Sequence, residues 1–69
     1  MVEIYRTNVT DSAAADRLLQ ELAIDFPGCI FNFDLNDCDH ILRMQYEAGC
    51  LPDITTFLIN RSWDCELID

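Results

Sequence analysis

The stretch CIFNFDLNDCDHILRMQYE, residues 29–47, decides the fold, because two matched strands flank a polar turn. In each half every second side chain is apolar, which is the period of a half-buried strand. The residues NDCD at positions 36–39 between the two halves are typical of a tight turn. These features together predict a β-hairpin.

The same alternation predicts the register of this hairpin. A turn centred on positions 37 and 38 pairs apolar residues throughout: Phe33 with Leu42, Phe31 with Met44, and Cys29 with Tyr46. A shift of one strand by a single residue would place a polar side chain opposite each apolar one. The hydrophobic pattern therefore favours this register over its neighbours.

The flanking sequence supplies two further strands and two helices. Residues 2–7 are typical of a strand. Residues 13–26 carry an apolar stripe at helical spacing, which Pro27 and Gly28 end. A second helix is predicted after the turn at 48–51, with Pro52 in its first turn, and a last strand is predicted over 63–68. The order βαββαβ predicts one α+β domain over residues 1–69, a ferredoxin-like four-stranded antiparallel sheet with two helices on one face.

This topology divides the side chains between a core and an open sheet face. The expected core comprises Leu18, Leu22, Phe31, Phe33, Leu42, Met44 and Phe57. The expected open face carries four interface candidates, Tyr5, Ile30, Ile41 and Arg43, among the polar residues Asn32, Asp34, Gln45, Asp64 and Glu66. Mixed apolar and polar patches of this kind are typical of protein interfaces, and an ordinary solvated sheet face is the alternative interpretation.

The composition excludes several classes of partner. Thirteen acidic residues against four basic ones give a net charge of −9, which repels nucleic acid and anionic membrane surfaces. A hydrophobic content of 51% argues against intrinsic disorder despite this charge. The first residues do not resemble a secretory signal, so we expect a cytoplasmic protein with no membrane segment. The acidity alternatively serves only to keep a small protein in solution.

The length, the element order and the strand–loop–helix beginning resemble the heavy-metal-associated domain, the fold of small copper chaperones. Within that likeness, FPG at 26–28 and NFDLNDCD at 32–39 are similar to small bacterial proteins of the same architecture. The metal-binding members hold their metal with a CxxC pair in the loop after the first strand. Here that loop reads TNVTDS at 7–12 and contains no cysteine. The resemblance thus implies the fold, and no metal ligand can be carried over.

Cys38 and His40 in the hairpin turn are weak candidates for a metal site, because thiolate and imidazole are ligands that zinc accepts. A closed site needs four ligands, and no second pair of Cys and His at finger spacing exists. A turn with a solvated histidine is the plainer interpretation. The lone histidine lacks a local catalytic signature, and two glycines cannot form a phosphate loop, so we expect neither an enzyme nor a cofactor.

Three functional hypotheses remain. The leading one is a small acidic, non-enzymatic interaction module that binds another protein or forms a homodimer through the open face or an edge strand. The second is a soft-metal or redox-responsive protein that uses Cys38 and His40. The third is a regulatory domain that binds a small ligand between two copies.

Overall fold

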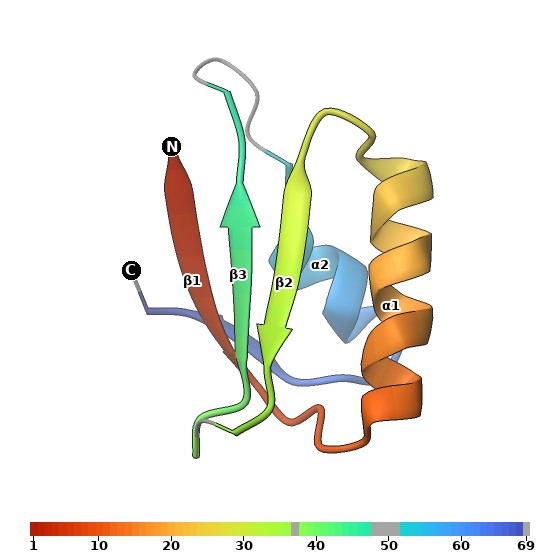
Figure 1. The fold of residues 1–69 in the computed structure, drawn as a ribbon, viewed down its shortest axis with the longest axis vertical. Coiled ribbons are helices and arrows are strands. Elements are labelled where there is room, and N and C mark those ends of the chain that lie inside the picture. The colour runs from red at the N-terminus through yellow and green to blue at the C-terminus, as the bar shows by residue number, and fades with distance from the viewer. Residues whose placement is uncertain (37, 48–51, 69) are drawn as a thin grey trace.

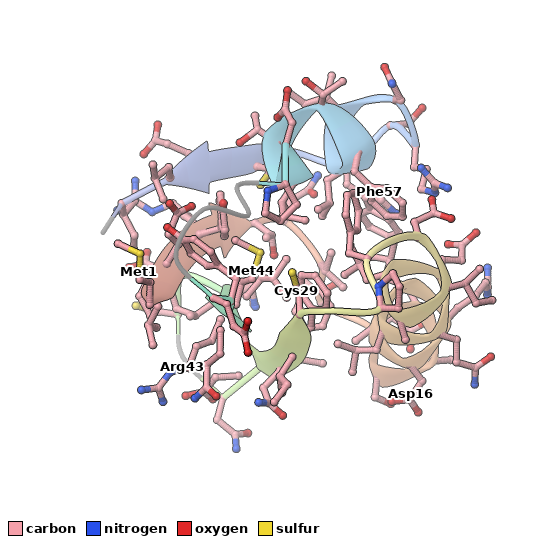
Figure 2. All side chains as sticks on the ribbon, turned by 90° about the horizontal axis from the view of Figure 1, so that it is seen from above. Met1, Asp16, Cys29, Arg43, Met44 and Phe57 are labelled. Carbon is pink, nitrogen blue, oxygen red and sulfur yellow. The ribbon has the colours of Figure 1, made fainter. Side chains whose placement is uncertain are left out.

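A computed structural model describes residues 1–36, 38–47 and 52–68 of the chain. Six elements follow one another in the predicted order: β1 (Val2–Thr7), α1 (Ser12–Asp25), β2 (Ile30–Asp34), β3 (Ile41–Gln45), α2 (Ile54–Ile59) and β4 (Cys65–Leu67). The strands form one antiparallel sheet in the order β2-β3-β1-β4, and both helices lie on the same side of it (Figures 1 and 2). The predicted α+β ferredoxin-like fold is confirmed.

The hairpin has the predicted register. Phe33 pairs with Leu42 and Phe31 pairs with Met44 in the ladder between β2 and β3. The ladder begins at Ile30, so the predicted pair of Cys29 and Tyr46 lies just outside it. Slippage by one residue would turn Leu42 and Met44 from the core towards solvent, and this cost holds the register.

Aspartates cap both helices. Asp11 accepts a hydrogen bond from the amide of Ala13 at the start of α1, at 3.2 Å. Asp53 accepts the amide of Thr56 at 3.0 Å and its hydroxyl at 2.6 Å. These hydrogen bonds lower the pKa of Asp53 because they stabilise its ionised form. Pro52, expected in the first turn of the second helix, instead precedes this cap, because the Asp53 side chain satisfies the free amides better than a proline ring does.

The core lies between the sheet and the helices. Leu18, Leu22, Leu42, Met44 and Phe57 are buried, as predicted. Phe31 and Phe33 were also predicted to be core residues; they pack against the core but are only half-buried, so the prediction is confirmed for them in part. Both lie on β2, which is an edge strand. Side chains of an edge strand have a neighbouring strand on one side only, and solvent therefore reaches them.

The prediction that Tyr5 lies on the open face is wrong. Tyr5 is 3% exposed and belongs to the core. It pairs with the buried Leu42, so β1 turns Glu3, Tyr5 and Thr7 towards the helices. The aliphatic residues Val2 and Ile4 therefore lie on the open face. The inward polar groups are hydrogen-bonded there: Glu3 accepts the Tyr5 and Tyr46 hydroxyls, and Thr7 donates to the His40 carbonyl.

Candidate functional site

The open face of the sheet presents the outward residues of all four strands. Arg43 lies near its centre, between Asn32 on β2 and Ile4 on β1. Figure 2 shows Arg43 pointing away from the helices, whereas its neighbour Met44 points into the interior. The open face comprises Val2, Ile4 and Arg6 of β1, Ile30, Asn32 and Asp34 of β2, Ile41, Arg43 and Gln45 of β3, Glu66 of β4, and Ile68.

Five of these eleven residues are aliphatic. Ile30 is 61% exposed, Val2 45% and Ile68 41%, while Ile4 and Ile41 are half-buried. Ile68 lies beside Ile4, since its amide donates to the Ile4 carbonyl at 2.9 Å. Contiguous exposed apolar surface commonly marks a binding site. The open face therefore has the composition of an interface.

The two arginines of this face differ in their ion pairing. Arg6 is held by two carboxylates, with Nε 3.4 Å from Asp39 and Nη1 3.1 Å from Glu66. Arg43 forms no ion pair with any described residue. It borders a shallow hollow of about 250 Å³, together with Ile4, Asn32, Phe33, Asp34 and Ile41. An exposed guanidinium beside such a hollow can bind a carboxylate or a carbonyl of an approaching molecule.

The turn of the hairpin carries the two weak metal candidates. Cys38 is an exposed free thiol. His40 is half-buried, with a left-handed backbone of φ 49°, and its carbonyl accepts the Thr7 hydroxyl at 2.6 Å. Its Nδ1 atom is buried and makes no hydrogen bond within the described structure. Among the residues that the structure describes, no group of three or more Cys, His, Asp or Glu side chains could hold a metal ion.

A pair of phenols on one carboxylate was not predicted from the sequence. Glu3 accepts the Tyr5 hydroxyl at 2.6 Å and the Tyr46 hydroxyl at 3.0 Å. Burial, and then the bond to Glu3, raises the pKa of Tyr5. The bond to Glu3 is the main cause that raises the pKa of Tyr46. Neutral phenols that donate to a carboxylate are poor bases, which argues against a catalytic role. The cluster instead links β1 to Tyr46, which follows β3.

The other described cysteines, Cys29 and Cys65, pack against the core. Cys65 is half-buried and faces the helices. Burial raises the pKa of its thiol, which disfavours the reactive thiolate. Cys29 is half-buried against the same core, and Cys50 lies outside the described residues.

Comparison of the chain with protein-family models, with curated proteins and with solved structures finds no match. None of the helices in the described part of the chain has the length and apolar content needed to cross a membrane. The resemblance to the heavy-metal-associated domain stays a prediction.

Proposed function

We propose that this chain is a non-enzymatic protein-binding module that contacts its partner through the open face of the sheet. The observation that carries the proposal is the group of five aliphatic side chains around Arg43. Arg43 itself lacks an ion-pair partner among the described residues. The helix side is closed by α1 and α2, whereas none of the described helices or strands covers the open face (Figure 2).

Burial of these aliphatic side chains supplies the driving force. Complete burial of one exposed isoleucine stabilises a complex by roughly 1.5–3 kcal/mol. Ile30 is 61% exposed and has the most to gain. Arg43 adds specificity, because a desolvated guanidinium requires a carboxylate or carbonyl partner.

The charges on this face favour a protein over a nucleic acid. Arg6 is already neutralised by Asp39 and Glu66, which leaves Arg43 to meet any phosphate. No aromatic ring lies among the outward residues of the strands, since Tyr5 points inward. RNA-binding sheets of this element order stack bases on such rings.

Site-specific photo-crosslinking tests the proposal. A benzophenone amino acid replaces Asn32, which is exposed on the open face, and in a control it replaces Asp16. Asp16 is exposed on α1 and points away from the sheet (Figure 2). We expect protein adducts from position 32 in the source cells and little from position 16. Equal yields at both positions, or adducts from position 16 alone, would show that the open face is not the binding surface.

A further inference from the structure

We infer that the partner on the open face is a second copy of this chain, placed face to face by a twofold axis. This inference rests on the proposed function and adds the identity of the partner. It begins from how the charges are distributed over the surface.

The open face carries little of the charge of a strongly acidic molecule. The whole chain carries a net charge of −9. The outward residues of the strands include two arginines, Arg6 and Arg43, against Asp34 and Glu66, and Asp39, which pairs with Arg6, makes a third acid, so two positive charges face three negative ones. The helices and the residues that flank them carry two arginines, Arg17 and Arg61, against five acids, Asp11, Asp16, Glu21, Asp25 and Asp53. Two copies therefore repel each other less through their open faces than through their helices.

The positions of Arg43 and Asp34 make the open face self-complementary. Asn32 pairs with Arg43 and Asp34 with Ile41, so Asp34 is the diagonal neighbour of Arg43. One Asp34 oxygen accepts the Asn36 amide at 3.2 Å, which holds the carboxylate at the hairpin end of the face. A twofold axis in the interface plane, between these two residues, sets each Arg43 opposite the Asp34 of the other copy. Symmetry then repeats the contact.

The size of the face limits the affinity. Four strands about 4.8 Å apart, with outward residues about 6.7 Å apart along each strand, give a face of roughly 400 Å². Two such faces bury roughly 800 Å², less than the 1,200–2,000 Å² of a stable complex. We therefore expect a weak dimer in exchange with monomer.

The test is sedimentation velocity from about 5 to about 500 μM protein in about 0.15 M salt, which screens long-range repulsion. The variants Arg43→Asp and Asp34→Arg should each weaken the dimer about tenfold or more, because like charges then face each other twice. The double variant, Arg43→Asp with Asp34→Arg, should return to within about threefold of the parent, because the pair is restored with reversed sign. Arg17→Asp makes the same charge change on exposed α1 and should leave the dimer unchanged.

A second pair of variants guards against misfolding. Ile30→Asn removes an exposed aliphatic side chain from the open face, and Ile24→Asn removes one from α1, where Ile24 is 78% exposed. Only Ile30→Asn should weaken the dimer. Circular dichroism confirms that each variant is folded.

Three results would overturn the inference: a monomer at every concentration, an Arg17→Asp effect equal to that of Arg43→Asp, or a double variant weaker than both single ones. If the chain is monomeric yet position 32 still crosslinks to a different protein, the proposed function stands and the identity of the partner is wrong. If neither self-association nor crosslinks from position 32 occur, both fail.

Discussion

Replacement of Tyr5 by Phe tests the inward orientation of β1, on which the composition of the open face depends. Tyr5 is 3% exposed, and its hydroxyl donates to Glu3 at 2.6 Å. The substitution removes this hydroxyl and leaves the ring in place. Hydrogen bonds to charged groups contribute about 1.5–3 kcal/mol, and Glu3 keeps the hydroxyl of Tyr46 at 3.0 Å. We therefore expect the free energy of unfolding to fall by about 1–2 kcal/mol near neutral pH.

The pH dependence gives a sharper result. Burial and the bond to Glu3 raise the pKa of Tyr5 above its ordinary value, which is about 10. The unfolded chain then loses the phenolic proton before the folded chain does. The stabilisation is complete below about pH 10 and is lost as the pH rises through the raised pKa. Tyr5→Phe removes this contribution, so its deficit relative to the parent should shrink above about pH 10.

Urea unfolding at neutral pH and at about pH 10.5 measures both effects, with the parent and the variant compared at each pH. The comparison cancels the titration of groups that do not interact with Tyr5, whereas Tyr46 and Cys65, whose pKa values are also raised, act on Tyr5 and contribute to the measured deficit. If the urea midpoint of Tyr5→Phe equalled that of the parent at both pH values, the Tyr5 hydroxyl would lie in solvent. The strand β1 would then be turned over, and Val2 and Ile4 would not belong to the open face.

Three further predictions follow from the core, a helix cap and the cysteine-free loop. Leu42→Ala should lower the free energy of unfolding by about 2–5 kcal/mol because Leu42 is 0% exposed, whereas Ile30→Ala at 61% exposure should cost under about 1 kcal/mol; similar losses in chemical denaturation would contradict this burial. Asp53→Ala should lower the free energy of unfolding at neutral pH, and this loss should shrink as the pH falls below about 4 and through the lowered pKa of Asp53, because protonation weakens the cap in the parent; a loss independent of pH would refute the cap. Metal analysis of protein purified without an affinity tag should find no stoichiometric copper(I), because residues 7–12 contain no cysteine; tight binding that persists in Cys38→Ser would disprove it.

The hairpin could be predicted because two independent patterns agree. Phe31 and Phe33 alternate on one strand, Leu42 and Met44 alternate on the other, and a single register satisfies both. The lesser burial of the two phenylalanines could not be predicted from alternation, because it depends on β2 lying at the sheet edge. A strand pattern specifies which face a side chain occupies and leaves open how much of that face is covered.

The orientation of β1 could not be predicted because its local pattern is ambiguous. Val2 and Ile4 are as apolar as a core face requires, and they alternate with Glu3 and Tyr5. The inward Glu3 accepts a hydrogen bond from Tyr46, which lies 43 residues further along the chain. No local window of sequence contains this contact.

The candidate site was predicted in part for the same reasons. Ile30, Ile41 and Arg43 lie on the open face as expected, because the hairpin alternation places them there. Tyr5 does not, and Val2 and Ile4 replace it. Ile68 joins the face through its amide bond to Ile4, and this signal depends on the pairing of β4 with β1.

Amide chemical-shift mapping by NMR tests most directly whether the open face is the binding surface. Spectra are compared between a dilute sample and one saturated with the partner, which we expect to be further copies of the chain. The largest changes should fall on Ile4, Asn32 and Arg43, with little change at Asp16 and Arg17 of α1. Changes centred on α1, or spread evenly over both sides of the molecule, would contradict an interface on the open face.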